Sequence, residues 1–289
     1  IPSPLTLPGV KRWTLDTVDC RSHLYCVDWS PNGREVACGT GQGEIRIYNV
    51  ESLELVQIVP GHRATVFAVA WSPDGTRLAT GSEDLTVRIW NRSGELESAW
   101  EVGVPVYDVA WAPNGKRLAC TAAVFEVGGG QVADLRDVGN VGSIAWTPDG
   151  QQLATSVGRE IYLRDSDGNI ESRRNVEFAS NVAAVRWNSE GNKLAACGWS
   201  AGLQIWDAAG NTETVMKDRP TSRRSAFTWS PDSQRLAVSA VSSVRLVGSD
   251  GAELLDYDLN VGIHDLCFSP DGSQRAAACD AGNLFIVSG

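Results

Sequence analysis

Histidines and cysteines beside carboxylates are the residues of this sequence that could do chemistry. The chain has three histidines and seven cysteines among its 289 residues. His264 stands next to Asp265, which could be half of a Ser-His-Asp relay, but no nucleophile elbow or glycine-rich oxyanion element accompanies the pair. His23 falls in an expected loop, where solvent should surround its ring. We therefore assign no catalytic residue and predict that the chain is not an enzyme.

Two short stretches could be mistaken for ligand-binding loops. The stretch RDSDGN, residues 164–169, resembles the start of a calcium loop, but such a loop needs a Glu six residues after its glycine, where this chain has Arg174. A turn between two strands explains it better. The stretch VGGGQ, residues 127–131, has neither the following helix nor the lysine of a phosphate-binding loop. No cofactor is predicted.

The cysteines indicate a packing role. They form no CxxC pair, so no zinc or other metal site is predicted. Cys38 and Cys120 occupy the same place in two units of a repeat described below, and places two units apart cannot reach the Cα separation of about 4.4–6.8 Å that a disulfide needs. We expect buried free thiols and hence a reducing, cytoplasmic compartment.

Charge and composition exclude several classes of function. The formal net charge is −10, which disfavours binding to nucleic acid or to an anionic membrane and mildly favours basic protein partners. No run of 18 apolar residues exists to span a bilayer. The first nine residues, IPSPLTLPG, have the composition of an interdomain linker, which suggests a piece of a longer protein.

One motif recurs along the whole chain and sets its architecture. VAWSPDG at Val69–Gly75 has six further copies, with spacings of 42, 40, 35, 41, 42 and 39 residues between aromatics; the seven aromatics are Trp29, Trp71, Trp111, Trp146, Trp187, Trp229 and Phe268. Each copy has an alternating stretch before the aromatic, a turn, a small apolar strand, a branched or aromatic strand and a polar strand. Four short antiparallel strands per unit of about 40 residues predict an all-β, seven-bladed propeller.

The two ends of the chain predict how the ring closes. The seventh copy stops after its third strand, and an unpaired strand precedes the first copy at residues 10–16. If this strand completes the last blade, two open sheet edges disappear. We therefore expect a linker over residues 1–9 and a single propeller over residues 10–289.

With these repeats, the chain resembles the WD-repeat propellers over nearly its whole length. The second copy carries Gly61-His62 before its first strand and LATGSEDLTVRIWN after its turn. The resemblance implies a buried hydrogen-bonded tetrad of His62, Thr80, Asp84 and Trp90. Other copies lack parts of this tetrad, and only Trp206-Asp207 keeps the literal Trp-Asp pair. In the shorter third copy, the turn between its second and third strands is expected to be missing or rebuilt around Gly128-Gly129-Gly130.

The resemblance also implies a binding site at one mouth of the central channel. The place four residues before each motif aromatic begins the innermost strand, and it is occupied by Tyr25, Phe67, Tyr107, Gly142, Ala183, Ser225 and His264. The large residues fall on neighbouring blades, so we expect an aromatic wall beside an open side. The predicted mouth site comprises Tyr25, Phe67, Tyr107, Asp108, Trp199, Ser225, His264 and Asp265. An aromatic wall beside carboxylates suits a cationic side chain, although these rings could equally plug the channel.

These observations favour a non-enzymatic scaffold that binds a partner peptide or loop, of basic character, at this mouth. One alternative is a ligand-sensing or autoinhibitory domain of a larger regulatory protein of the signalling ATPase or kinase type. Another is an enzyme with its active site in the channel, but the sequence offers no cluster of histidines and carboxylates there. We expect the isolated domain to be monomeric. The step from fold to function rests on family analogy.

Overall fold

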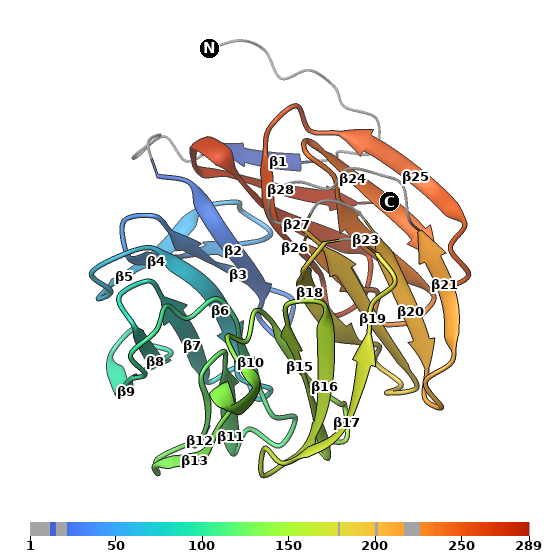
Figure 1. The fold of residues 1–289 in the computed structure, drawn as a ribbon. Coiled ribbons are helices and arrows are strands. Elements are labelled where there is room, and N and C mark those ends of the chain that lie inside the picture. Colours follow the sequence, from blue (N-terminus) through green and yellow to red (C-terminus); the bar gives the residue numbers. More distant parts are fainter. Residues whose placement is uncertain (1–11, 16–21, 179, 200–201, 217–225, 289) are drawn as a thin grey trace.

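The computed structural model describes residues 12–15, 22–178, 180–199, 202–216 and 226–288. Over these residues, the chain forms seven four-stranded antiparallel sheets arranged around a common centre (Figure 1). The prediction of a seven-bladed propeller is confirmed.

Blades one to three follow one another along the chain. Blade one holds β2 Leu24–Trp29, β3 Glu35–Thr40, β4 Glu44–Asn49 and β5 Leu55–Pro60. Blade two holds β6 Val66–Trp71, β7 Arg77–Ser82, β8 Thr86–Asn91 and β9 Leu96–Glu101. Blade three holds β10 Val109–Trp111, β11 Arg117–Cys120, β12 Ala123–Glu126 and β13 Gln131–Asp134, and is followed by the 3-10 turn η1 Arg136–Val138.

Blades four to seven complete the circle. Blade four holds β14 Ile144–Trp146, β15 Gln152–Val157, β16 Glu160–Asp165 and β17 Ile170–Asn175. Blade five holds β18 Val182–Trp187, β19 Lys193–Gly198, β20 Leu203–Asp207 and β21 Thr212–Met216. Blade six holds β22 Phe227–Trp229, β23 Arg235–Ser239, β24 Ser243–Gly248 and β25 Glu253–Asp258. Blade seven holds β26 Ile263–Phe268, β27 Gln274–Cys279 and β28 Asn283–Ser288, with the 3-10 turn η2 Asp280–Gly282 before β28.

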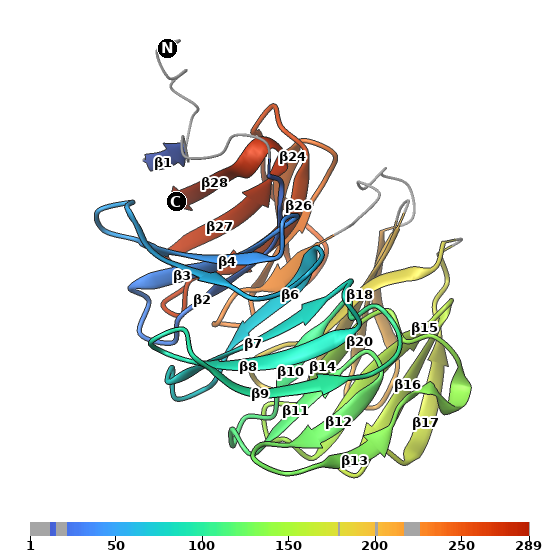
Figure 2. The ribbon, with the colours of Figure 1, turned by 90° about the vertical axis from the view of Figure 1, so that its left-hand side faces the viewer.

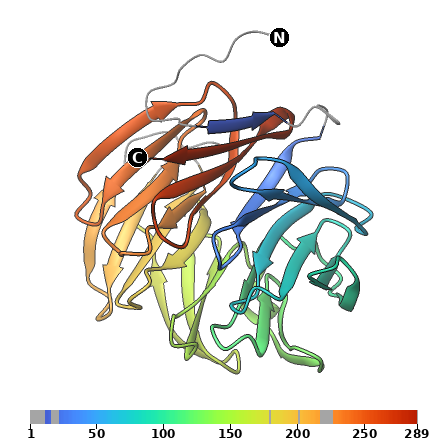
Figure 3. The same ribbon diagram turned by 180° about the vertical axis from the view of Figure 1, so that it is seen from behind.

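The ring is closed by the N-terminal strand. Strand β1 Arg12–Leu15 pairs antiparallel with β28, so that Arg12 lies opposite Ile286 and Leu15 opposite Asn283. Figures 2 and 3 show β1 alongside β28, at the edge of the sheet of β26 and β27. The other residues of the predicted strand 10–16, and the predicted linker over residues 1–9, lie outside the described residues.

The repeated turn explains why the motif reads Ser-Pro-Asp-Gly. In blade two the Ser72 hydroxyl donates to Asp74 at 2.6 Å and accepts the backbone N–H of Arg77 at 2.9 Å. Gly75 has φ of +68°, in the left-handed region that glycine enters without steric cost. A side chain at Gly75 would also touch Pro31 of the preceding blade, so the turns contact one another around the ring.

The motif tryptophans join neighbouring blades. The indole N–H donates to the backbone carbonyl of the residue before the motif aromatic of the preceding blade, as Trp111 does to Ala70 at 3.0 Å and Trp146 to Ala110 at 3.1 Å. Trp29 and Trp229 make the same bond, at 3.1 and 3.2 Å. These four indoles therefore link adjacent sheets through a hydrogen bond. Among the described residues, the buried Nε1 atoms of Trp71 and Trp187 have no such partner.

Blade three differs from the prediction. Its third strand, β12, begins only two residues after β11, so the turn between them is a tight one at residues 121–122. The glycines Gly128-Gly129-Gly130 lie instead in the turn between β12 and β13. The expectation that they rebuild the earlier turn was wrong, because the stretch AVFE pairs directly with β11 as a full strand.

Two other expectations concern cysteines and helices. Cys38 and Cys120 are buried, and no disulfide joins any two of the six described cysteines. Within the described ranges, none of the helical segments is long and apolar enough to cross a membrane.

Candidate functional site

The innermost strands surround a central cavity of about 1130 Å³. This cavity is lined by six of the seven residues that stand four positions before a motif aromatic. Tyr25, Phe67, Tyr107 and His264 lie on one side, and Gly142 and Ala183 lie on the other. Trp199 lines it too. Ser225, the seventh, lies outside the described residues.

Three aromatic rings from successive blades form a continuous wall, named here the aromatic arc. Tyr25 meets Phe67 edge to face at a centroid distance of 5.9 Å, and Phe67 stacks on Tyr107 at 5.3 Å. These are favourable geometries for aromatic pairs. His264 continues the arc, with its ring 5.0 Å from that of Tyr25.

The far end of the arc is open to solvent. Tyr107 is 50% exposed, and Trp199 in the turn between β19 and β20 is 54% exposed. Gly142 and Ala183 provide little bulk between these two large rings. The arrangement is a cavity with apolar walls and an accessible entrance, as binding sites commonly have.

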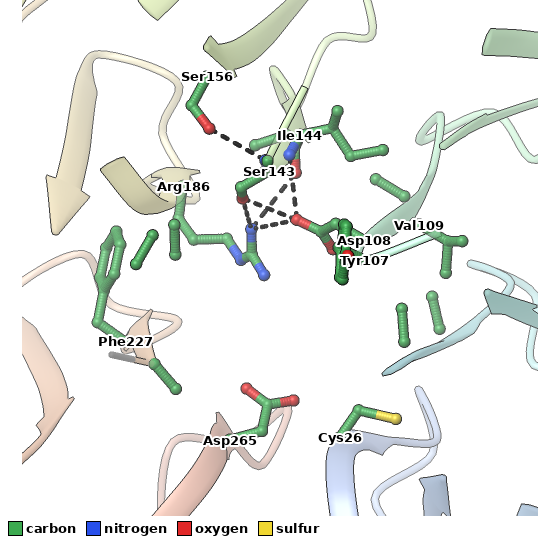
Figure 4. A pocket seen from close by; sticks show the side chains of 18 of the residues that line it. Cys26, Tyr107, Asp108, Val109, Ser143, Ile144, Ser156, Arg186, Phe227 and Asp265 are labelled. Carbon is green, nitrogen blue, oxygen red and sulfur yellow. Dashed lines mark hydrogen bonds and ion pairs between the residues drawn. The ribbon is translucent and has the colours of Figure 1, made fainter. Parts of the chain in front are cut away.

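The carboxylate of Asp108 does not face the cavity alone. Arg186 on β18 extends toward it, with Nη1 at 3.1 Å from Asp108 Oδ2 and 3.0 Å from Ser143 Oγ (Figure 4). The Ser143 hydroxyl donates to the same Oδ2 at 2.7 Å, as does the N–H of Ile144 at 3.0 Å. This network joins blades three, four and five and matches the charge of Asp108 with that of Arg186.

Asp265 lies across the open channel from this network (Figure 4) and is also engaged. Its Oδ2 accepts the N–H of Val27 in blade one at 2.9 Å, just as Asp108 accepts that of Ile144. Burial raises the pKa of Asp265 to about 6, although the hydrogen bond from Val27 and the charge of Arg186 oppose this. The two predicted mouth carboxylates thus serve first to join adjacent blades.

Asp28 joins two blades in the same way, from the position directly before the motif aromatic rather than three before it. Its Oδ2 accepts the backbone N–H of Trp71 at 2.7 Å, and its Oδ1 accepts the Cys267 thiol at 3.5 Å. Burial raises the pKa of Asp28 to about 7, which the hydrogen bond from Trp71 only partly offsets. Asp28 was not among the predicted site residues, since its only signal in the sequence is a carboxylate directly before the motif Trp29.

The histidines are arranged differently from the relay considered for His264 and Asp265. His264 Nε2 lies 2.7 Å from Asp280 Oδ1, and His23 Nδ1 lies 2.7 Å from the same oxygen. His23 is exposed, as expected, but its ring is held by this contact. Among the described residues, this is the one group of three His, Cys, Asp or Glu side chains close enough to share a cation.

The predicted tetrad residues contact one another in blade two. Trp90 Nε1 donates to Thr80 Oγ1 at 2.9 Å, Thr80 Oγ1 lies 2.7 Å from His62 Nε2, and His62 Nδ1 lies 2.9 Å from Asp84 Oδ2. Burial lowers the pKa of His62. Burial opposes ionisation of Asp84, but hydrogen bonds from Thr86, the Arg63 backbone and His62 outweigh it and hold its pKa at about 2. A neutral imidazole between a carboxylate and a hydroxyl satisfies every polar atom in the chain of contacts.

Blade four replaces the tryptophan of this arrangement with Arg164. This side chain is fully buried and occupies the place opposite Leu153 that Trp90 occupies opposite Leu78. It donates to Thr155 Oγ1 at 3.3 Å and pairs with Asp137 in η1 at 2.5 Å. Sequence reasoning missed this substitution, although the strand ending RD where others end in Trp-Asn or Trp-Asp was its signal.

The seven sheets, the closing strand and the inter-blade tryptophans define a WD-repeat β-propeller. Comparison with known families narrows this class. Residues 23–288 match the family described as the IFT122 first β-propeller, and the chain belongs to that family.

Similar proteins agree with this assignment. The chain is 25% identical over 147 residues to the intraflagellar transport protein 80 homologs of Rattus norvegicus and Mus musculus, which is 50% of this chain and 19% of each relative. It thus spans about a fifth of the length of these relatives. Among solved structures, the β-propeller domain of Cps50 (Swd1) from Myceliophteria thermophila superposes with a TM-score of 0.85 at 16% identity, covering 97% of this chain and 99% of that one. The likeness to this last structure concerns the fold alone.

Proposed function

We propose that this chain is a protein-interaction platform that holds a segment of a partner protein at the mouth lined by the aromatic arc. The observation that carries the proposal is the continuous contact of Tyr25, Phe67 and Tyr107 at the entrance of a cavity of about 1130 Å³. Aromatic side chains are enriched among the residues that dominate binding energy at protein interfaces. Their rings are held by one another, so little conformational entropy is lost on binding.

The names of the relatives support a role in an assembly. The similar rat and mouse proteins are named as intraflagellar transport protein 80 homologs, and the family is named for the first β-propeller of IFT122. Propellers present rigid surfaces to partners, and we infer that this chain does so as one domain of a transport-type assembly. We infer a cytoplasmic location, which is supported by the lack of a disulfide between any two of the six described cysteines.

The contacts of the carboxylates narrow the chemistry of the partner segment. Asp108 is already paired with Arg186, and Asp265 accepts a backbone N–H from the next blade. We therefore infer that the anchor is an apolar or aromatic side chain, or a cation that stacks on the Tyr107 ring without an ion pair deep in the channel. The net charge of −10 favours basic residues flanking that anchor through long-range attraction.

The same proposal includes the absence of catalysis. His264 Nε2 contacts Asp280, and the His264 ring lies beside those of Tyr25 and His23, so these contacts differ from the relay with Asp265 that the sequence suggested. A binding role uses the arc as it stands and needs no activated nucleophile.

A selection experiment tests this function. Peptides are selected on the wild-type chain from a displayed library rich in aromatic and basic residues, and their affinities are then measured with Tyr107→Ala and Phe67→Ala variants in a chelating buffer. We expect at least a tenfold loss of affinity in each variant, since a truncated hot-spot residue costs about 2 kcal/mol or more.

The matched control truncates exposed apolar residues elsewhere. Val56 and Ile58 are exposed on β5, the outermost strand of blade one, and do not line the cavity. The variants Val56→Ala and Ile58→Ala should leave affinity unchanged. Failure to select any binder, or equal affinity for wild type and arc variants, would refute the proposed function.

A further inference from the structure

A cluster of two imidazoles and a carboxylate lies at the seam where the ring closes. His23 directly precedes β2 in blade one, while His264 on β26 and Asp280 at the start of η2 belong to blade seven. Blade seven is the one that β1 completes. The cluster therefore connects the two blades between which the chain passes after its closing strand.

The three ligand-type atoms converge on one point. His23 Nδ1 and His264 Nε2 each lie 2.7 Å from Asp280 Oδ1, and all three atoms lie within 4.8 Å of one another. A tetrahedral centre with bonds of about 2.1 Å places its ligand atoms about 3.4 Å apart. Each nitrogen would thus move less than about 1 Å from the carboxylate oxygen to admit an ion. His23, which is exposed, has room for this adjustment.

The surrounding residues hold the carboxylate and one imidazole in place. The Asp280 N–H donates to the carbonyl of Gly262 at 2.9 Å, and its carbonyl accepts Asn283 Nδ2 at 3.0 Å. The carboxylate packs directly on Gly262, where any side chain would collide with it. The Tyr25 ring lies 5.0 Å from that of His264. Outer contacts of this kind fix ligands in binding geometry before an ion arrives.

We propose that His23, His264 and Asp280 bind one divalent transition-metal ion such as Zn²⁺ at the seam between blades seven and one. Imidazole nitrogen is a ligand that Zn²⁺ and its neighbours in the first transition row prefer, whereas Ca²⁺ and Mg²⁺ require more oxygen ligands. Three protein ligands leave a fourth position for water. Because the ligands come from both ends of the sequence, the ion binds the closed ring and stabilises it relative to the unfolded chain.

Calorimetric titration of the chelator-treated chain with ZnCl₂ tests this site. We expect one ion per chain, with binding at least tenfold weaker in His23→Gln and in His264→Gln. Asp250→Asn, in an exposed turn of blade six, is the matched control and should bind like wild type. Zinc should raise the melting temperature of wild type and Asp250→Asn but not that of the two histidine variants, whose circular dichroism reports that they are folded.

A second measurement separates these ligands from thiols. The Co²⁺-loaded chain should show visible bands of a nitrogen and oxygen site without sulfur-to-cobalt charge-transfer bands. Charge-transfer bands, the absence of saturable binding, or equal binding by wild type and both histidine variants would overturn the proposal. The peptide experiments use a chelating buffer, so failure of the metal site and failure of the docking function are distinguishable.

Discussion

The tetrad of blade two provides the sharpest stability prediction. Thr80 lies at its centre, since its hydroxyl accepts the Trp90 indole N–H at 2.9 Å and lies 2.7 Å from His62 Nε2. The substitution Thr80→Val replaces the hydroxyl with a methyl group of similar size. Valine is compatible with the site because Val238 occupies the equivalent place in blade six, where it pairs with Arg245 as Thr80 pairs with Arg88.

The expected magnitude follows from the atoms left without partners. The indole N–H and the imidazole nitrogen are both buried, and each unsatisfied buried polar group costs about 1–3 kcal/mol. Burial of the added methyl group returns about 1 kcal/mol. We expect the free energy of unfolding to fall by about 1–5 kcal/mol.

Urea unfolding followed by tryptophan fluorescence measures this loss, and a double-mutant cycle assigns it. Trp90→Phe removes the indole N–H, and phenylalanine is native at the equivalent place in blade three, Phe125. In that background Thr80→Val should cost about 1–2 kcal/mol less than in wild type. A loss below about 0.5 kcal/mol for Thr80→Val alone, or strict additivity in the cycle, would refute the reasoning.

Three further predictions concern the channel and the packing of the blades. Burial holds the pKa of Asp28 at about 7 against an ordinary value of 3.8, so the folded chain binds this proton more tightly than the unfolded chain and loses stability as pH rises from about 4 to 7. The substitution Asp28→Asn should remove this loss. Urea unfolding should find the variant more stable than wild type by about 2–4 kcal/mol at pH 7.5 but not at pH 4. Arg186→Met should lower the free energy of unfolding by about 1–3 kcal/mol, because Asp108 loses its cation. Adding Asp108→Asn should recover part of the lost stability. No recovery would mean that Arg186 acts through packing alone. Gly61→Ala should lower the melting temperature and reduce the free energy of unfolding by about 1–3 kcal/mol, because the new methyl group would collide with the Trp90 indole. Gly130→Ala has open space around the new methyl group and should leave the melting temperature unchanged. Equal shifts in the two variants would contradict this explanation.

The features that the sequence predicted are those that each repeat specifies locally. The motif tryptophan, the Ser-Pro-Asp-Gly turn and the alternating strand lie within about ten residues of one another, so their geometry follows from short-range rules. In the six copies described there, the residue four positions before the motif aromatic lines the cavity, because register within one strand is fixed by its alternation.

The features that the sequence did not predict depend on contacts between residues that lie far apart in the sequence. Arg186 and Asp108 are 78 residues apart, and His23 and Asp280 are 257 apart. No local pattern pairs them, because the closure of the ring decides which side chains meet. The prediction that the channel carboxylates face a ligand failed to anticipate that backbone N–H groups of the next blade already occupy them.

Blade three shows the limit of the repeat itself. This unit is shorter than its neighbours, and its glycine run was assigned to the turn before the third strand. The structure places a two-residue turn there, and the hairpin pairing of β11 with β12 moves the glycines to the following turn.

Photocrosslinking from the mouth tests the central claim most directly. Tyr107 is replaced by benzoylphenylalanine in one chain, and Val56 on the outermost strand of blade one in another, and each is irradiated with the selected partner peptide. We expect efficient crosslinking from position 107 and background levels from position 56. Equal crosslinking from both positions, or crosslinking from position 56 alone, would contradict docking at the aromatic arc.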